Sequence, residues 1–197
     1  MNRLECIKAI APITGSTLVL TTAGGTTHEW WAFGDNRGQL MVKTLGLGPS
    51  IGLGLALSLP TIPVIALDGD GALLMNLYEL VTAAAQRPRN LIHVCFDNGV
   101  YESSGSVPTM TARGRIDVCE IARGSGVERV VEPETVTDFE AAIRHSLDDP
   151  AHTFVHAKVE PFRAKVDRIP LDEVENRYRF AARVRELRDA TTGEGRS

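Results

Sequence analysis

The chain has 197 residues, of which 43% are hydrophobic and 23% are charged, and its formal net charge is −4. This length is sufficient for one domain with a sizeable core, and the composition is typical of a globular protein. The small acidic excess gives no electrostatic reason to expect a nucleic acid partner. We expect a single domain over 1–189, followed by a disordered tail over 190–197.

The cysteines indicate the cellular compartment. Cys6, Cys95 and Cys119 are odd in number and widely spaced. They form neither a metal-type pair nor a disulfide framework, so we expect buried thiols in a reduced, cytoplasmic protein. The uncharged stretch 44–67 is long enough to span a bilayer, but prolines interrupt it. A helix, a break and a buried strand fit this stretch better than a membrane segment.

Strand and helix patterns alternate along the chain. Strand patterns occupy 16–22, 62–68, 90–97, 128–132 and 153–159. The second and third are continuous apolar runs, which are typical of strands covered on both faces. Helical patterns follow at 74–86, 118–123 and 136–147, and a charged helix is expected at 171–189. This alternation predicts an α/β fold with a parallel sheet and right-handed crossovers.

Polar or glycine-rich loops follow the first three predicted strands. Their sequences are TTAGGTTHEW, DGDGA and DNGVYESSGS. Ligands of open parallel sheets bind at the carboxyl ends of the strands. The three loops therefore predict a ligand site at one edge of the sheet.

The GDG motif combines three useful properties. Gly69 and Gly71 allow a ligand to approach the main chain closely, and Asp70 offers a hard oxygen donor. The helix that follows presents free N–H groups to an anion. Together these features fit Mg²⁺ bound to a phosphate group. The alternative for this motif alone is a plain turn or helix cap, because Gly and Asp are the commonest turn residues.

Asn98 follows the next predicted strand. An Asn-Gly pair is also a hairpin signal, but no strand pattern comes directly after it. We therefore favour a loop that lines a site. If the two strands are neighbours, about 5 Å apart, then Asp70 and Asn98 can reach one cation.

At this point the motifs GDGALLMN and FDNGVYES resemble the paired motif of thiamine diphosphate enzymes. The resemblance implies a three-layer α/β/α domain of the diphosphate-binding type. It also implies thiamine diphosphate and Mg²⁺, with the metal held by Asp70, Asn98 and the backbone carbonyl of Val100. The stretch TTAGGTTHEWW is similar to the first diphosphate-contacting loop of this family, which implies that Gly24 and Gly25 contact the diphosphate.

A further segment, KTLGLGPSIGLGLAL, is similar to the family's GSMGLASSIGLGLAL. The family residue that matches Leu45 is the apolar wedge beneath the bent cofactor. Lys43 and Thr44 replace a Gly-Ser pair. The resemblance adds four further cofactor contacts: Gly69, Gly71, Ala72 and Tyr101.

Over 17–159 the chain most resembles the β subunits of sulfopyruvate and phosphonopyruvate decarboxylases. This implies the β subunit of a heteromeric 2-oxo acid decarboxylase that acts on a 3-substituted pyruvate. A pyrimidine-binding α subunit would supply the activating glutamate, so we assign that role to neither Glu79 nor Glu102. The loop NGVYESSGSVPT keeps most of the group's NGxxxSxGxQPT, with Val107 in place of Gln.

Candidate substrate contacts are His28, Ser103 and Ser104, although a polar helix start and a solvated loop are the plain alternatives. His93 is expected to be structural, because it lies inside a buried strand pattern. The other histidines, His145, His152 and His156, show no metal spacing. The stretch 30–33, WWAF, is either a partner contact or part of the core.

Two other functions stay open on these residues. One is a subunit of a thiamine-dependent carboligase or synthase, which forms a C–C bond after decarboxylation. The other is a scaffold subunit that keeps the fold without turnover, and the intact Asp70 and Asn98 argue against it.

Overall fold

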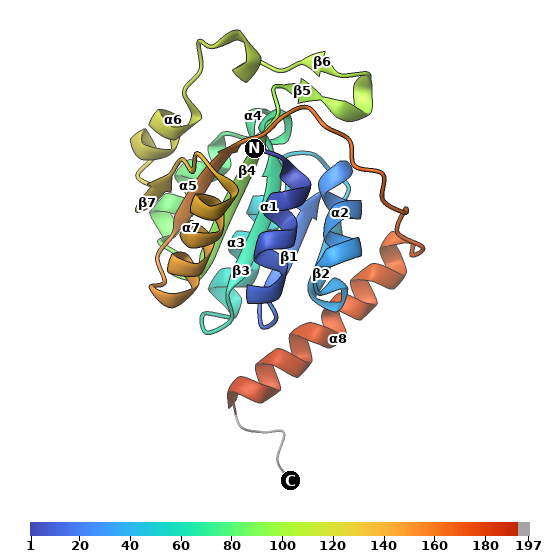
Figure 1. Ribbon diagram of the computed structural model, residues 1–197. Helices are drawn as coiled ribbons and strands as arrows, with labels where there is room; N and C mark the ends of the chain where they lie inside the picture. Colours follow the sequence, from blue (N-terminus) through green and yellow to red (C-terminus); the bar gives the residue numbers. More distant parts are fainter. Residues whose placement is uncertain (193–197) are drawn as a thin grey trace.

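Six parallel strands form the central sheet of the computed structural model, which describes residues 1–192 (Figure 1). Their order is β2-β1-β3-β4-β8-β7. The strands are β1 Leu18–Thr22, β2 Gln39–Val42, β3 Val64–Gly69, β4 Leu91–Asp97, β7 Arg129–Val131 and β8 Thr153–Lys158. β3 pairs directly with β4, so the strands that precede Asp70 and Asn98 are neighbours, which is the condition under which both residues can reach one cation.

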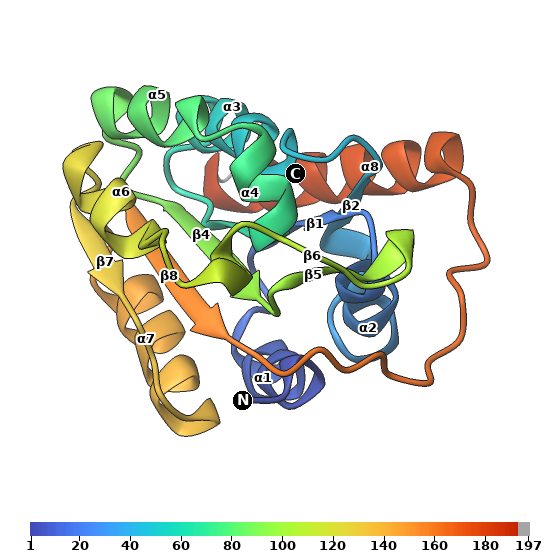
Figure 2. The same ribbon diagram turned by 90° about the horizontal axis from the view of Figure 1, so that it is seen from above.

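Helices cover both faces of this sheet. They are α1 Arg3–Ile10, α2 Gly25–Phe33, α3 Gly48–Ser58, α4 Asp70–Met75, α5 Tyr78–Gln86, α6 Val118–Gly124, α7 Val136–Asp148 and α8 Glu173–Thr192. Seen from above, α1, α2 and α7 lie on one side, and α3, α5 and α8 on the other (Figure 2). The three-layer α/β/α fold expected from the sequence is therefore confirmed.

Alternating side chains of the strands supply the two halves of the core. Val19 and Val94 pack with Phe139 of α7 on one face of the sheet. On the other face, Leu20 packs with residues of α3 and α8, among them Phe180. Strands of this kind read as continuous apolar runs because both of their faces are buried.

Some elements differ from the sequence expectation. The helix expected over 74–86 is two helices, α4 and α5, because the chain breaks at Asn76, whose side chain donates to the Gly46 carbonyl at 2.7 Å. No strand was predicted at β2. This edge strand is short, and Asn176 of α8 bonds to the Met41 N–H and to the Gln39 carbonyl, each at 2.9 Å.

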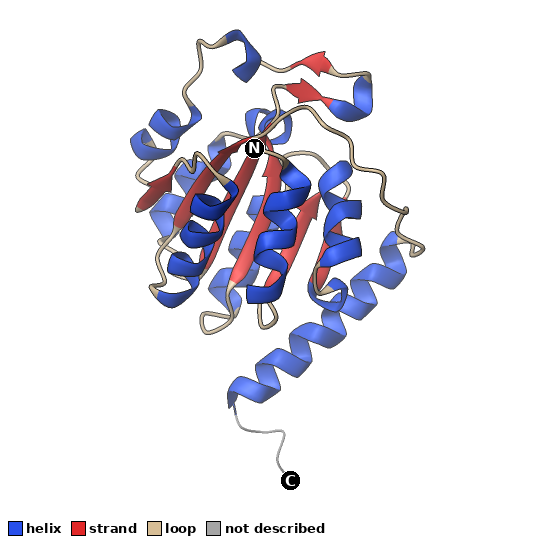
Figure 3. Cartoon of the chain, viewed as in Figure 1, coloured by secondary structure: helices blue, strands red, loops and turns tan. Residues whose placement is uncertain are grey.

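The loop after Asn98 contains a small hairpin that the sequence pattern did not predict. Its strands are β5 Val100–Tyr101 and β6 Val107–Pro108. Asn98 and Gly99 precede this hairpin and do not form its turn. The hairpin lies over the carboxyl edge of the sheet, as does the long loop 159–172 between β8 and α8 (Figure 3).

Helix α8 ends at Thr192, so the first residues of the expected 190–197 tail are helical, and 193–197 lie outside the described residues. No helix within 1–192 has the length and apolarity needed to cross a membrane.

The expected buried thiols are confirmed for Cys6, Cys95 and Cys119. Trp30 is fully buried, whereas Phe33 is 44% exposed, so the WWAF stretch is divided between core and surface.

Candidate functional site

A cavity opens where the strand order reverses between β1 and β3, at the carboxyl ends of β1, β3 and β4. Such switch points are the usual ligand sites of open parallel sheets. Every residue that the resemblance places at the cofactor lines this cavity: Gly24, Gly25, Leu45, Gly69, Asp70, Gly71, Ala72, Asn98, Val100 and Tyr101. The fold thus brings them together, and their contact with a cofactor stays a prediction.

Asp70, the first residue of α4, is 2% exposed. Its Oδ2 accepts hydrogen bonds from the hydroxyls of Thr109 and Thr111. Burial raises the pKa of Asp70. The hydrogen bond from Thr109 lowers this pKa, whereas the negative charge of Asp97 raises it further, and the net result is a raised pKa. A cation beside Asp70 would offset both causes, so the site is electrostatically suited to a metal.

Asp97, at the end of β4, lies beside Asp70 and has partners on two sides. Its Oδ1 faces the Thr111 hydroxyl at 2.9 Å, and its Oδ2 faces Nε2 of His156 at 2.9 Å. Burial alone would raise the pKa of Asp97, but the bonds from His156 and Thr111 outweigh it and lower the pKa. Asp97 therefore stays ionised next to Asp70.

The other two predicted metal ligands follow β4: Asn98 lies in the turn, and Val100 begins β5. The Asn98 side chain accepts from the Val100 N–H at 3.0 Å and donates to Oε1 of Glu102 at 2.7 Å. An amide oxygen has a second lone pair, which stays available to a cation. Val100 faces Pro108 across the hairpin, and Pro108 has no N–H to donate to the Val100 carbonyl.

The absence of a side chain at two glycines lets neighbouring side chains pack closely in the cavity wall. A methyl group at Gly71 would lie 2.3 Å from Cε1 of Tyr101, and one at Gly25 would lie 2.3 Å from Nη2 of Arg3. Gly24 has φ +135° and precedes α2 without a side-chain cap, so the first N–H groups of this helix are free to bind an anion. With the all-oxygen donor set, this cradle fits a diphosphate and Mg²⁺.

A buried ion cluster supports the cavity wall. Arg3 of α1 bonds to Glu29 at 2.8 and 2.9 Å and to Glu102 at 2.8 and 3.3 Å. Burial opposes the charge of Arg3, but these two carboxylates raise its pKa above the ordinary value. Glu102, which bonds to Asn98, is thereby held in place by the N-terminal helix.

A second cavity shares Gly24, Gly25, Glu102 and Ser103 with the first. Its wall also contains His28 of α2 and the loop residues Arg163 and Arg168. The Ile169 N–H donates to Nδ1 of His28 at 3.3 Å, so the neutral ring carries its proton on Nε2. Burial, followed by the positive charges of Lys43, Arg168 and Arg163, lowers the pKa of His28.

Of the candidate substrate residues, His28 and Ser103 line this second cavity, whereas the exposed Ser104 lines neither cavity. Glu79 is 4% exposed and pairs with Nδ1 of His93 at 3.0 Å, away from both cavities. Burial would lower the pKa of His93, but Glu79 and Asp68 outweigh it and raise the pKa to about 9. The structural role expected for His93 agrees with these contacts.

Sequence reasoning missed several residues of the site. Arg3 begins α1 and Glu29 lies within α2, and neither helix was predicted, so no motif pointed to these residues. Thr109 lies within the Pro-Thr pair of the family's loop pattern, which was a usable signal. Arg163 and Arg168 lie in the loop 159–172, beyond the stretch that carries the resemblance.

Together, the switch-point cavity, the uncapped N-terminus of α2 and the oxygen donors are suited to a diphosphate group and a divalent cation. The particular family follows from comparison with known proteins. The family described as "Thiamine pyrophosphate enzyme, C-terminal TPP binding domain" matches residues 24–157, and this chain belongs to it.

Relatives over the full length and over part of the length were found. The chain is 39% identical to a sulfopyruvate decarboxylase subunit beta of Methanothermobacter thermautotrophicus, covering 97% of this chain and 98% of the relative. It is 33% identical to a phosphonopyruvate decarboxylase of Streptomyces hygroscopicus, covering 78% of this chain and 38% of the relative. A solved thiamine diphosphate-dependent 4-hydroxybenzoylformate decarboxylase of Rhodococcus jostii shares the fold, with TM-score 0.67, 20% identity, and coverage of 83% and 33% of the two chains.

Proposed function

We propose that this chain is the β subunit of a thiamine diphosphate- and Mg²⁺-dependent decarboxylase that acts on a 3-substituted pyruvate such as sulfopyruvate or phosphonopyruvate. The observation that carries the proposal is the convergence of Asp70, Asn98 and Val100 on the cavity that also contains Gly24 and Gly25. The full-length relative named as a β subunit supports the same assignment.

When bound, thiamine diphosphate would supply a nucleophilic carbon and an acceptor for the electron pair left after carbon dioxide departs. The chain's own residues position this chemistry. Asp70, Asn98 and the Val100 carbonyl would hold Mg²⁺, and the N–H groups at Gly24 and Gly25 would bind the diphosphate. Half-buried Leu45 would pack against the rings of the bound cofactor.

The second cavity supports an anionic substrate. Arg163 and Arg168 lie on its wall with His28 and Ser103, and it adjoins the cofactor cavity through shared residues. Guanidinium groups bind oxyanions such as sulfonate and phosphonate through paired N–H donors. We assign the carboxyl-distal, anionic group of the substrate to this cavity, with the Nε2 proton of His28 as an additional donor.

A partner α subunit is part of the proposal. Exposed apolar side chains occur at the start of α3, the end of α4 and the start of α5: Leu47, Ile51, Met75, Tyr78 and Val81. Asn76 joins these helices by bonds to Gly46 and Ser50. An exposed apolar surface at the rim of a ligand cavity is suited to a protein partner. The free thiols support a cytoplasmic location for the complex.

Native mass spectrometry of the complex purified from its own cells, followed by assays with sulfopyruvate and phosphonopyruvate, tests the proposal. We expect a second chain, thiamine diphosphate and Mg²⁺, and the release of CO₂ with free aldehyde. A product with a new C–C bond and little free aldehyde would show that the complex is a carboligase and not a decarboxylase. An assembled complex without cofactor-dependent turnover would show that this chain is a scaffold subunit.

The partner surface has its own test. Tyr78→Lys should prevent the second chain from co-purifying, because Tyr78 is 76% exposed and its substitution leaves the core intact. Ala141→Lys is the matched control, because this exposed residue lies on α7 across the sheet. Equal recovery of the second chain with both variants would contradict this interface.

The anion assignment is tested by Arg163→Gln and Arg168→Gln in the assembled complex. Each should raise KM for the sulfonate or phosphonate substrate about tenfold, which corresponds to about 1.4 kcal/mol. Turnover of unsubstituted pyruvate should change far less. Lys165→Gln is the control, since Lys165 is an exposed cation of the same loop that does not line the cavity.

A further inference from the structure

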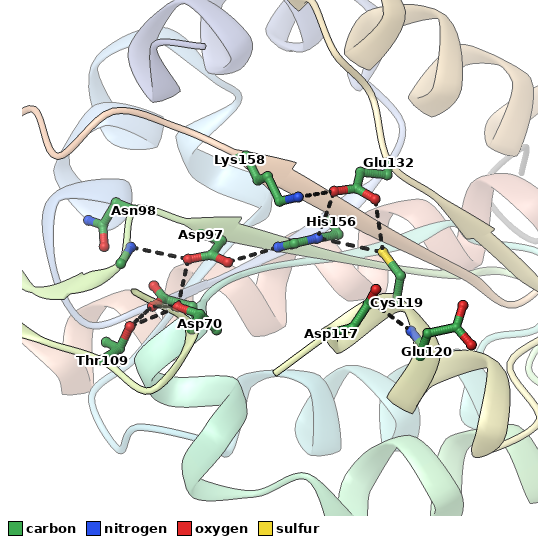
Figure 4. Close-up of polar contacts among 12 residues, drawn as sticks. Asp70, Asp97, Asn98, Thr109, Asp117, Cys119, Glu120, Glu132, His156 and Lys158 are labelled. Carbon is green, nitrogen blue, oxygen red and sulfur yellow. Dashed lines mark hydrogen bonds and ion pairs between the residues drawn. The ribbon is translucent and has the colours of Figure 1, made fainter. Parts of the chain in front are cut away.

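A second group of metal-ligating side chains lies on the other side of Asp97 from Asp70 (Figure 4). Cys119 comes from α6, Glu132 follows β7, and His156 comes from β8. One ligand atom from each lies within 4.8 Å of the others. Cys119 and His156 are 1% and 4% exposed, so two of the three donors are buried.

The spacing of these atoms matches a small metal site. Sγ of Cys119 lies 3.5 Å from Nδ1 of His156 and 3.9 Å from Oε2 of Glu132. Nδ1 of His156 lies 3.6 Å from Oε1 of Glu132. In a tetrahedral Zn²⁺ site with ordinary bond lengths, neighbouring ligand atoms are about 3.3–3.6 Å apart. Small side-chain movements would bring all three donors onto one ion.

The surroundings orient the donors toward a common point. Nε2 of His156 pairs with Oδ2 of Asp97 at 2.9 Å, which leaves Nδ1 facing Cys119 and Glu132. This carboxylate–histidine arrangement is the usual support behind a metal-ligating imidazole. Lys158 pairs with Oε1 of Glu132, so Oε2 is the oxygen left facing the thiol.

The charges fit a cation. The carboxylates of Glu132 and Asp117 act on the thiol, but Asp117 already caps α6 through the Glu120 N–H at 2.9 Å. Burial, followed by Glu132 and Asp117, raises the pKa of the Cys119 thiol to about 11, although Arg123 and Lys158 oppose this. A divalent ion would stabilise the thiolate, and its binding would release the thiol proton to solvent.

We propose that Cys119, Glu132 and His156 bind one Zn²⁺-like divalent cation, with Asp97 and Lys158 as supporting residues and water in the fourth position. These three donors line neither of the two cavities described above. They join α6 to the ends of β7 and β8, and through Asp97 they adjoin the magnesium ligands. The ion would therefore tie together the part of the sheet that carries the end of β4.

The test is titration of the metal-stripped protein with Co²⁺, without thiamine diphosphate. Co²⁺ bound to a thiolate gives a charge-transfer band in the near ultraviolet, whereas the oxygen donors around Asp70 cannot produce one. We expect one equivalent of Co²⁺ to generate this band, Zn²⁺ to abolish it, and Zn²⁺ to raise the melting temperature.

Cys119→Ser should remove the band, and Glu132→Gln should weaken Co²⁺ binding at least tenfold. Glu132 is the safer variant for folding, because its side chain is 38% exposed. Cys6→Ser is the control, since Cys6 is a buried thiol in α1 on the opposite side of the sheet. No band in the folded wild-type protein, or an unchanged band in Cys119→Ser, would overturn the proposal.

Discussion

The regions on the two sides of Asp97 differ in the chemistry of their donors. On one side, Asp70 and the hydroxyls of Thr109 and Thr111 present only oxygen. On the other side, Cys119, His156 and Glu132 present sulfur, nitrogen and oxygen. Hard oxygen sets favour Mg²⁺, and thiolate–imidazole sets favour Zn²⁺-like ions. One carboxylate, Asp97, thus lies between two groups of donors that prefer different metal ions.

Asp70→Asn removes the carboxylate from the oxygen donors on the Asp70 side, and we expect the largest effect from this variant. Cofactor and Mg²⁺ binding in the assembled complex should weaken at least about 100-fold, because even supporting residues of metal sites cost up to that factor. The melting temperature of the free chain should stay equal or rise, since the charge of Asp70 is buried beside Asp97. Unchanged metal-dependent cofactor binding, measured by calorimetry, would refute the assignment of Asp70.

The buried group of His93, Glu79 and Asp68 contrasts with both regions beside Asp97. The charge of its histidine is balanced inside the core by the two carboxylates. The pKa of His93 is raised to about 9. This contribution to stability is complete below the unfolded pKa of about 6.5 and is lost as pH rises through about 9. The full loss is roughly 3 kcal/mol.

The measurement is the free energy of unfolding of wild type and His93→Gln between pH 6 and 9.5. The advantage of the wild-type protein should shrink with rising pH. A constant difference across this range would show that His93 does not carry the extra proton in the folded state.

Asp97→Asn tests the connection between the two sides. Loss of the carboxylate behind His156 should weaken Co²⁺ binding at the Cys119 cluster about 10- to 100-fold. The pKa of Asp70 should fall toward its ordinary value, because its negative neighbour is gone. Co²⁺ titration and the pH dependence of Mg²⁺ binding measure these effects. If Asp97→Asn changes neither the Co²⁺ affinity nor this pH dependence, Asp97 does not connect the two groups of donors.

The smallest expected effect comes from Gly71→Ala, which alters the shape of the oxygen side and none of its donors. The added methyl group would lie 2.3 Å from Cε1 of Tyr101, so this ring must move. We expect cofactor affinity to fall about tenfold, or about 1.4 kcal/mol. Gly54→Ala in α3 is the control, because a methyl group there meets nothing within 4 Å. Equal affinities of the two variants would argue against close packing at Gly71.

Much of the fold and of the oxygen site could be predicted from local patterns. The apolar runs that became β3 and β4 specify strands buried on both faces, and their adjacency places Asp70 near Asn98. Local patterns failed where distant contacts stabilise a short element. β2 depends on Asn176 from α8, and the break before α5 depends on the bond from Asn76 to Gly46.

The sequence by itself determined the α/β class, the order of its long elements and the residues of the GDG and Asn-Gly turns. Motif spacing carries this information because each motif lies within one strand and the loop that follows it. Only the tertiary structure decided which distant side chains meet. Arg3 reaches Glu102, the loop 159–172 brings Arg168 to His28, and Cys119 meets His156. These pairs have no common spacing, because strand order and crossovers bring them together, and a linear pattern does not encode that geometry.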